Sequence, residues 1–352
     1  MGETGPAVLD TASLADLLRG AHNGSAEVLG ALSEQPLLVV DLDTPGELDG
    51  IAMPFMLPCV IVGISGAGTA TAPLDGVDVA LTRSVQPDAP WVSVADFDAG
   101  LEEVASAVRA SPMASVILAQ VLRSGRSDSL DHDLVLESLA YSTLQGGAEF
   151  RQWLDTRPPA AKRPDRETTL LVGQRGPRLS ITLNRPEVRN AYDAAMRDEL
   201  CEALSLVGAE SSITQVDLYG SGPDFCSGGD LREFGTAVDP VEAHLIRTSR
   251  SAARLLGVVG DRVTAHLHGA CIGAGIELPA AARWVRAATD TRMQLPEVGM
   301  GLIPGAGGTA TLPRRIGRHR TAWLGLTGQA IDAATGLAWN LVDEVTDEVA
   351  HP

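Results

Sequence analysis

The stretch HGACIGAGIELPAAA, from His268 to Ala282, predicts a strand that passes into a helix through a run of glycines. Glycine allows tight turns and leaves backbone N–H groups uncovered where the strand ends. A second glycine-rich stretch, LPEVGMGLIPGAGGT, runs from Leu295 to Thr309. Each stretch contains one glutamate, Glu277 or Glu297. The sequence therefore predicts two carboxylates that share acid and base work on one substrate.

Short apolar strands and helices alternate around these stretches. Strands are predicted at LSITLN, at TQVDLYG from Thr214, from Arg262 to Leu267 and through Trp284 and Val285. A helix from about Asp193 has one apolar face, formed by Met196, Leu200 and Leu204. A further helix is expected from about Pro240 to Leu256. This alternation indicates an α/β fold with a parallel sheet.

Residues 308–328, GTATLPRRIGRHRTAWLGLTG, combine helical character with breakers and positive charge. We expect two helical turns here, broken by Pro313 and Gly317. A run of arginines with one histidine, His319, is typical of a solvated stretch. Most of this charge is therefore predicted to lie at the surface.

The chain is long enough for about two domains, since 352 residues exceed the ~100–200 residues of one domain. The boundary falls at DTRPPAAKRPDRE, from Asp155 to Glu167, where prolines and charges replace apolar periodicity. We therefore divide the chain into residues 1–155, a linker at 156–167 and a second unit at 168–352.

Composition narrows the classes of partner. A hydrophobic content of 45% with 20% charged residues is that of a globular protein. The formal net charge of −18 disfavours nucleic acid and anionic membranes, which attract clustered Lys and Arg. The four cysteines are widely spaced, which favours reduced, buried thiols. Without an apolar run of membrane length or a signal-peptide pattern, a cytoplasmic location is expected.

Four motifs in order resemble the crotonase superfamily, also called enoyl-CoA hydratases/isomerases. The two stretches quoted above are preceded by LNRPEVRNA, residues 183–191, and GPDFCSGGDL, residues 222–231. The two glutamates are 20 residues apart in the sequence, the interval that the resemblance implies for the hydratase branch. The resemblance implies a crotonase-like ββα spiral core with a helical subdomain.

The implied reaction is reversible addition of water to a 2-enoyl-CoA thioester. Negative charge that develops on the thioester oxygen needs hydrogen-bond donors, and the matching motifs assign the backbone N–H groups of Gly229 and Ala274 to this oxyanion hole. Glu297 is expected to deliver a proton to Cα, and Glu277 to act on the attacking water. In a poorly solvated cleft their titrations should be coupled.

The resemblance also implies a set of substrate-binding residues, namely Arg189, Ala191, Ser227, Gly228, Asp230 and Leu231. Arg189 either meets a phosphate of coenzyme A or is an exposed arginine without a role. For Asp230, capping the turn is favoured over substrate contact. Coenzyme A belongs to the substrate, so no separate cofactor and no metal are expected. The family further implies a homotrimer or hexamer.

Other interpretations stay open at this point. The same scaffold supports an enoyl-CoA isomerase or an acyl-CoA hydrolase, and the chain could instead be a non-catalytic subunit that binds acyl-CoA. His266 and His268 alternate on a predicted strand, which favours packing over metal or proton chemistry. Cys226 is better explained as a small apolar filler than as a nucleophile.

The first 155 residues pose a separate question, because family members normally continue past the equivalent of NLVDEV with a helical subdomain. Helix-like stretches at residues 94–123 and 131–159 resemble that subdomain, and PLLVVDLD, LPCVIVGISG and GVDVALT resemble core strands. One hypothesis makes this half a degenerate crotonase repeat, inert alone, whose helices complete the second half. The alternative is an unrelated α/β domain.

Overall fold

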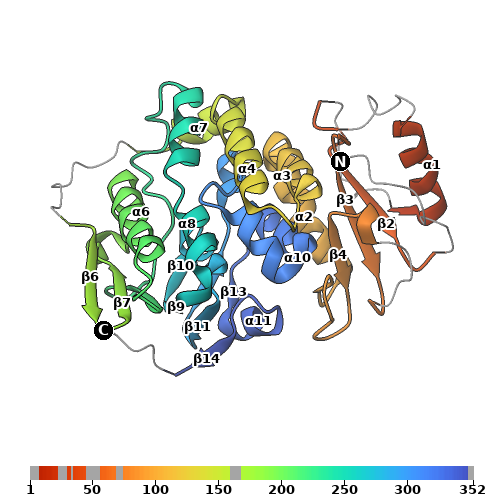
Figure 1. Ribbon diagram of the computed structural model, residues 1–352. Coiled ribbons are helices and arrows are strands. Elements are labelled where there is room, and N and C mark those ends of the chain that lie inside the picture. The colour runs from red at the N-terminus through yellow and green to blue at the C-terminus, as the bar shows by residue number, and fades with distance from the viewer. Residues whose placement is uncertain are drawn as a thin grey trace.

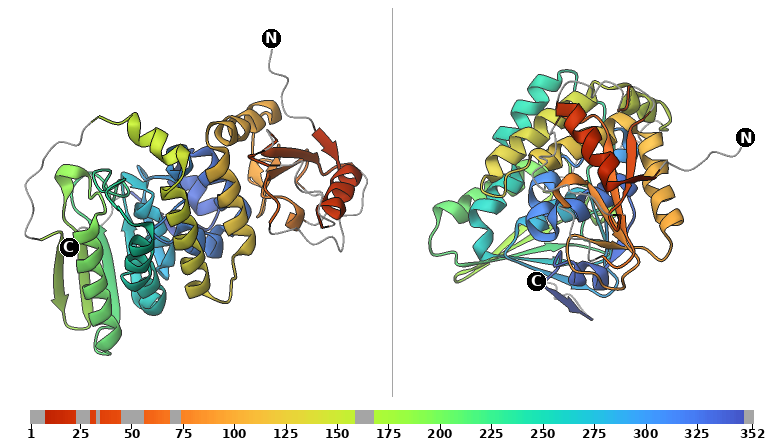
Figure 2. Two further views of the ribbon diagram at one scale, coloured as in Figure 1. Left: turned by 90° about the horizontal axis from the view of Figure 1, so that it is seen from above. Right: turned by 90° about the vertical axis from the view of Figure 1, so that its right-hand side faces the viewer.

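Two β-sheets lie at opposite ends of the molecule, and helices from both halves of the chain lie between them (Figures 1 and 2). The computed structural model describes residues 8–22, 30–32, 35–44, 56–68, 74–158 and 168–347. Of the predicted linker, only residues 156–158 fall within this part.

The larger sheet belongs to the second half and has the strand order β14-β11-β9-β8-β7-β6. Its strands are β6 (Leu170–Arg175), β7 (Arg178–Leu183), β8 (Gln215–Gly220), β9 (Val263–Leu267), β11 (Trp284–Ala288) and β14 (Glu344–Thr346). All neighbours are parallel except the β6–β7 hairpin. The predicted strands of this half and their parallel pairing are therefore confirmed.

A smaller sheet begins where β9 ends. It has the order β10-β12-β13, with bounds Ala270–Ile272, Arg292–Gln294 and Ile331–Asp332. Between β9 and β10 stands Gly269 with φ +54°, and a Cβ there would lie 2.2 Å from the carbonyl oxygen of Pro223. Only glycine fits this close approach, which turns the chain from one sheet into the other.

The helices of the second half are α6 (Ala194–Ala209), α7 (Pro240–Ser249), α8 (Ala252–Val259), α9 (Ala274–Glu277), α10 (Gly308–Thr327) and α11 (Ala333–Ala338). As predicted, α6 buries Met196, Leu200 and Leu204. The single helix expected over 240–256 was wrong. The chain breaks at Arg250 (φ −118°, ψ 60°), and the Ser251 hydroxyl then caps α8 by accepting a hydrogen bond from the N–H of Arg254.

The first half contains a five-stranded, all-parallel sheet whose strands follow one another in chain order. They are β1 (Val8–Asp10), β2 (Leu37–Asp41), β3 (Val60–Ser65), β4 (Val79–Thr82) and β5 (Val92–Ser93). Helix α1 (Thr11–His22) packs on it. The strands predicted in PLLVVDLD, LPCVIVGISG and GVDVALT are confirmed. Whether this half descends from a crotonase repeat stays a prediction.

Four helices then lead from this sheet to the second half, and they lie almost entirely within the two stretches predicted to be helical. They are α2 (Phe97–Ala110), α3 (Pro112–Ser124), α4 (Leu130–Gln145) and α5 (Ala148–Asp155). Helix α3 packs on α10 and α4 packs on α7. One hydrophobic cluster contains both Val62 of β3 and Leu312 of α10, so the two halves share a core. No single described helix is long and apolar enough to cross a membrane, whereas α2 and α3 have that length and composition as a pair bent by 109°.

The break predicted at Gly317 is confirmed, because two helical segments meet at a kink there and together form α10, whereas Pro313 lies inside the first segment without breaking it. The prediction that most of the positive charge lies at the surface was wrong, since much of it is buried or partly buried. The Arg320 side chain, 2% exposed, donates to the carbonyl oxygens of Trp91 and Pro87. Arg318 likewise donates to the carbonyl of Val77. The arginines satisfy backbone acceptors of the first half, which a charge pattern cannot reveal.

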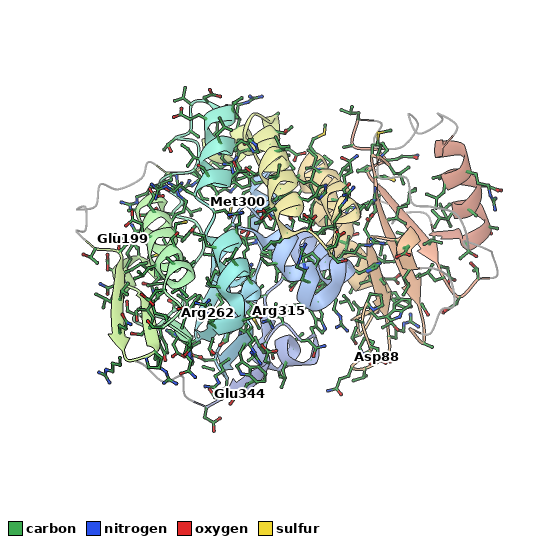
Figure 3. The ribbon with its side chains drawn as sticks, viewed as in Figure 1. Asp88, Glu199, Arg262, Met300, Arg315 and Glu344 are labelled. Carbon is green, nitrogen blue, oxygen red and sulfur yellow. The ribbon has the colours of Figure 1, made fainter. Side chains whose placement is uncertain are left out.

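Arg315 of the same helix makes its hydrogen bonds to residues of the second half (Figure 3). It donates to the carbonyl oxygens of Ala280 and Ala282, beyond the end of α9. Helix α10 is therefore tied both to the first-half sheet and to the segment that carries Glu277.

Candidate active site

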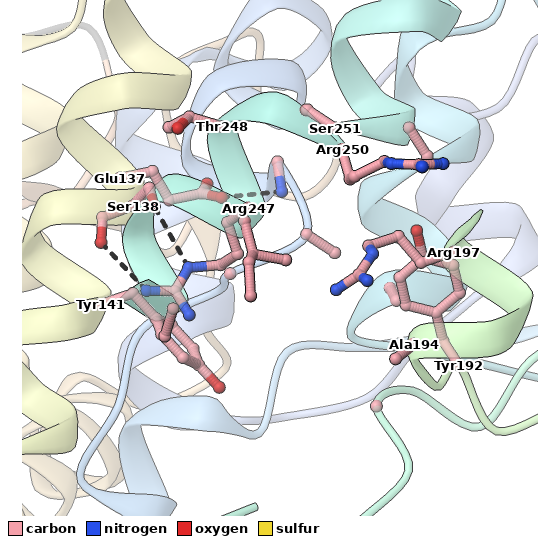
Figure 4. Close-up of a pocket in the computed structure, with 18 of the residues that line it drawn as sticks. Glu137, Ser138, Tyr141, Tyr192, Ala194, Arg197, Arg247, Thr248, Arg250 and Ser251 are labelled. Atoms are coloured by element: carbon pink, nitrogen blue, oxygen red, sulfur yellow. Dashed lines mark hydrogen bonds between the residues drawn. The ribbon is translucent and has the colours of Figure 1, made fainter. Parts of the chain in front are cut away.

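A cavity of about 690 Å³ opens between the two halves. Figure 4 shows its walls, which α4 of the first half and α6 and α7 of the second half supply in part. Of the glutamates that line this cavity, three are buried, namely Glu137 from α4, Glu277 from α9 and Glu297. Two of them are the pair that the sequence analysis singled out.

Glu277 ends the short helix α9, close to the helix start, as Pro279 two residues later predicts. Its side chain is 2% exposed. The Oε2 atom accepts hydrogen bonds from the N–H groups of Ala306 at 2.7 Å and Gly308 at 2.8 Å. This leaves the second oxygen, Oε1, on the side of Gly273.

Glu297 begins a 3-10 turn, Glu297–Met300. Its Oε2 atom is buried and has no hydrogen-bond partner among the described residues. Gly273 shows how near the two carboxylates come, because a Cβ at this position would lie 2.5 Å from Oε1 of Glu297 and 3.6 Å from Oε1 of Glu277. The two acids therefore face one small space above a glycine that cannot be enlarged.

Glu137 is the residue that the sequence analysis missed. Its Oε1 accepts from the N–H of Gly307 at 2.7 Å, and its Oε2 accepts from the N–H of Thr309 at 2.8 Å and from the Thr309 hydroxyl at 2.7 Å. These partners are about half the chain away in sequence. A local signal existed, since Glu137 interrupts the inner face of α4 between Leu134 and Tyr141.

The two hydrogen-bonded glutamates share one turn. The four successive N–H groups from Ala306 to Thr309 point alternately to Glu277 and Glu137. This turn leads into α10, whose first N–H groups have no acceptor inside the helix. The positive end of the helix dipole also favours carboxylates here. The GAGGT sequence thus fixes one carboxylate from each half.

Burial raises the pKa of all three carboxyl groups. It raises that of Glu277 to about 7, opposed by the Ala306 and Gly308 hydrogen bonds. Burial and then repulsion by Glu277 raise the pKa of Glu137 to about 8. For Glu297, burial followed by the charges of Glu277 and Glu137 raises the pKa well above its ordinary value. Near neutral pH the cluster therefore holds protons that it can exchange.

Gly229 and Ala274 both line the cavity. The β-bridge between Tyr192 and Gly229 uses the N–H groups of Tyr192 and Asp230 as donors. The N–H of Gly229 itself takes no part in this bridge. Ala274 is the first residue of α9, and its N–H has no acceptor within the helix. The structure thus brings both amides to the wall that the two predicted acids reach.

The predicted substrate-binding residues are more scattered. Asp230 lines the cavity, but its carboxylate pairs with Arg185 at 3.0 Å and Arg232 at 2.7 Å. Burial opposes ionisation of Asp230, yet the hydrogen bonds from Arg232 and Arg185 hold its pKa below the ordinary range. This arrangement agrees with the favoured structural role.

The remaining members of that set lie outside the cavity lining, and they are Arg189, Ala191, Ser227, Gly228 and Leu231. Arg189 has a left-handed backbone with φ +55°. Its guanidinium pairs with Asp224 at 2.6 Å, although its side chain is 61% exposed. Neither of the alternatives for Arg189 is tested by this geometry.

The histidines and cysteines have packing roles. His266 is buried, pairs with Asp217 at 2.9 Å and stacks on Tyr219, and His268 is buried as well. All four cysteines are free and buried, as predicted. Burial raises the pKa of Cys226 to about 12, which disfavours the thiolate that a nucleophile requires.

Known proteins resemble the second half of this chain. The family model described as "Enoyl-CoA hydratase/isomerase" matches residues 178–351. A putative enoyl-CoA hydratase/isomerase of Bacillus subtilis (strain 168) is 36% identical, over 47% of this chain and 64% of that protein. The 2,3-dehydroadipyl-CoA hydratase of Escherichia coli (strain K12) is 32% identical, over 50% of this chain and 68% of that protein.

The 1,2-epoxyphenylacetyl-CoA isomerase of Escherichia coli (strain K12) is also 32% identical, over 48% of this chain and 66% of that protein. The chain thus spans about two thirds of the length of these relatives, 64% in the Bacillus case. With its spiral α/β core, its glycine turns and the two acids above Gly273, the chain belongs to the enoyl-CoA hydratase/isomerase family of the crotonase superfamily.

Proposed function

We propose that this protein is an enoyl-CoA hydratase, which adds water reversibly to a 2-enoyl-CoA to form a 3-hydroxyacyl-CoA. The observation that carries this proposal is the approach of two carboxylates to one point, since an oxygen of Glu277 and an oxygen of Glu297 both lie within 3.6 Å of the Cβ position of Gly273. Water addition needs such a pair, because one proton leaves the water and one proton reaches Cα.

The two acids differ in ways that suggest separate roles. Glu277 is held by two N–H groups through Oε2, so its free Oε1 can accept a proton from water as the water oxygen bonds to Cβ. Burial and its acidic neighbours raise the pKa of Glu297 well above its ordinary range. A protonated Glu297 can then deliver its proton to Cα.

The thioester oxygen gains negative charge while water attacks. We assign its stabilisation to the N–H groups of Gly229 and Ala274, both on the cavity wall. The position of Ala274 at the start of α9 adds unsatisfied backbone donors, and one such donor typically contributes ~2.7–4 kcal/mol to lowering the barrier. The reaction needs no cofactor beyond the coenzyme A of its substrate. We keep the expectations of a homotrimer or hexamer and of a cytoplasmic location as proposals.

A double-bond shift is the second candidate reaction. It moves one proton between two carbons and so requires only one acid that both takes and gives a proton. Glu297 suits that task, because its buried Oε2 has no partner among the described residues. The relative named an isomerase shows that this branch of chemistry occurs within the family.

The test is a spectrophotometric assay of crotonyl-CoA hydration and of 3-enoyl-CoA isomerisation. Glu277→Gln and Glu297→Gln should each lower the hydration rate by roughly 10²- to 10⁴-fold. Glu199→Gln is the matched control, because Glu199 also accepts two backbone N–H groups, those of Thr169 and Leu170, but lies outside the cavity lining. Hydration that survives both active-site substitutions refutes the proposal. Isomerisation that survives Glu277→Gln while hydration is absent from the wild type favours the isomerase.

A further inference from the structure

Arg247 of α7 reaches the cavity as a cation with neutral partners (Figure 4). Its Nε donates to the Ser138 hydroxyl at 3.1 Å and its remaining nitrogens donate to Ser142 and Gln145. Its guanidinium lies 4.7 Å from the centre of the Tyr141 ring. All these partners belong to α4, so the first half fixes the position of Arg247.

Some of the other charged side chains of the cavity lining form ion pairs. Asp131 pairs with Arg254 at 3.0 Å, and Asp193 pairs with Arg185 at 2.8 Å. Across residues 8–347, as far as the structure describes them, no carboxylate lies within ion-pair distance of Arg247. A partly buried guanidinium without an anion is costly, which suggests that an anion is brought by a ligand.

A second cation faces the same space. Figure 4 shows Arg197 of α6 entering the cavity opposite Arg247. Burial lowers the pKa of Arg247, and among its charged neighbours Tyr141 and Glu137 raise it while Arg197 lowers it. Arg197 does have a partner, the partly exposed Asp198 at 2.9 Å. The two guanidinium groups are thus near enough to repel each other, and an anion between them would relieve that repulsion.

We propose that Arg247, with Arg197 across the cavity, binds a carboxylate at the far end of the acyl chain, so that the preferred substrates are enoyl-CoA esters of dicarboxylic acids. This inference rests on the proposed function, because it assumes that an acyl thioester occupies the cavity. Bidentate pairing of a guanidinium with a carboxylate supplies both affinity and direction.

The location of Arg247 favours the acyl end over the coenzyme A phosphates. The Tyr141 ring beneath Arg247 packs on Gly305, where a Cβ would lie 2.5 Å from the ring. The next residue, Ala306, donates its N–H to Glu277. Arg247 is therefore one aromatic ring away from the proposed reaction centre, whereas the phosphates are separated from the thioester by the whole pantetheine arm.

The competing explanation is that Arg247 only balances the buried glutamates. Glu137 does raise the pKa of Arg247, so part of that balance exists. The two explanations predict different selectivity. A balancing charge affects every substrate alike, whereas a carboxylate receptor affects only acyl chains that carry a carboxylate.

Binding of saturated, unreactive esters separates these outcomes without relying on turnover. We expect isothermal titration calorimetry to show that the wild type binds glutaryl-CoA roughly 10- to 100-fold more tightly than butyryl-CoA. Arg247→Gln should remove this preference and leave butyryl-CoA binding unchanged. Arg197→Gln should reduce it in part. Arg286→Gln is the control, because Arg286 forms an exposed pair with Glu344 outside the cavity lining.

Two results would overturn the inference. One is a wild type that binds both esters equally well. The other is an Arg247→Gln protein, shown to be folded by its thermal melt, that loses affinity for both esters and for free coenzyme A by the same factor, which would indicate a phosphate contact or a structural role. If the wild type hydrates crotonyl-CoA but does not prefer glutaryl-CoA over butyryl-CoA, only the carboxylate-binding inference is refuted. If it prefers glutaryl-CoA but does not hydrate crotonyl-CoA, only the proposed hydratase function is refuted.

Discussion

The two halves of the chain contribute to the same cavity by different means. The second half carries four motifs, and its glycine turns place Glu277 and Glu297 together. The first half carries no such motif, yet α4 contributes Glu137, Ser138 and Tyr141 to the cavity lining. Both halves contain a run of parallel strands in chain order. The comparison shows that the lack of a motif in a segment does not place it outside the site.

The way the halves join explains the difference. Glycine motifs act over a few residues, so their chemistry is visible in the sequence. The first half acts over long separations, as when Arg318 of α10 donates to the carbonyl of Val77 or Glu137 accepts from Gly307. Such contacts depend on how distant elements pack.

The largest expected effect tests the internal support of the first half. Arg123 of α3 is buried with Asp78 beside β4, paired at Nε–Oδ1 2.7 Å, and it also donates to the carbonyl oxygens of Leu57 and Cys59. Arg123→Met removes both guanidinium contacts of the buried Asp78 carboxylate, which keeps only Arg318 at 3.9 Å and the N–H of Ile61. It should lower the free energy of unfolding by ~3–5 kcal/mol. Urea denaturation measures it.

The matched control for this substitution is Arg109→Met. Arg109 pairs with Glu102 on the exposed side of α2, and such surface pairs contribute ~0–1 kcal/mol. Equal effects of the two substitutions would mean that the buried pair does not support the first-half sheet.

The second effect concerns the glycine that separates the two acids. At Gly273, with φ +51°, an added Cβ would collide with Oε1 of Glu297 at 2.5 Å. Displacing a reacting group by about 1 Å can cost roughly 10²-fold in rate, so Gly273→Ala should lower kcat by about that factor. Gly176→Ala is the control, because Gly176 also has a positive φ, +59°, but has open space around it. It should leave kcat unchanged, and a similar loss in both variants would contradict the assignment.

Some of the structural features described above were predictable from the sequence, and others were not. The strands and the α6 face were predictable, because local periodicity encodes them. The meeting of Glu277 with Glu297 was predictable from the resemblance of their motifs to a known family. Glu137 and the buried α10 arginines were not. Their partners are main-chain groups of the other half, and a backbone amide or carbonyl leaves no trace in the residue type that supplies it.

The third effect tests whether Glu137 acts on the chemistry or only on the fold. Its negative charge raises the pKa of Glu297, so Glu137→Gln should lower that pKa. A proton donor with a lower pKa loses its proton sooner as pH rises. The alkaline limb of the kcat profile should therefore move to lower pH by on the order of one unit.

The control for Glu137→Gln is Glu149→Gln. Glu149 likewise accepts two backbone N–H groups, those of Met113 and Ala114, but it lies outside the cavity lining. A purely structural role for Glu137 predicts that neither substitution moves the pH profile.

Glu137 should also influence how stability depends on pH. Its pKa is about 8 in the folded protein against an ordinary value of 4.5, so the folded state holds a proton that the unfolded state has released. Stability from this group is complete at acid pH and is lost as pH rises through about 8. Burial lowers the pKa of His319 from 6.5 to about 4. This group therefore makes stability rise with pH, but only below its ordinary pKa of 6.5. Between about pH 6.5 and 8, therefore, Glu137→Gln should flatten the fall in unfolding free energy.

The smallest effect asks whether the halves unfold together. Asp96 caps α2 by accepting from the N–H groups of Asp98 and Ala99, and Asp332 caps α11 by accepting from the N–H of Thr335. Replacing either by alanine should cost about 1 kcal/mol. Because one hydrophobic cluster contains residues from both halves, we expect a single urea transition that both substitutions shift alike. Caps in separate halves share no partner, so the double variant should show the sum of the single effects. Two resolved transitions, each sensitive to one cap, would instead show that the first half unfolds on its own. Glu137 and the α4 contacts of Arg247 would then be lost from the cavity while the second half stays folded.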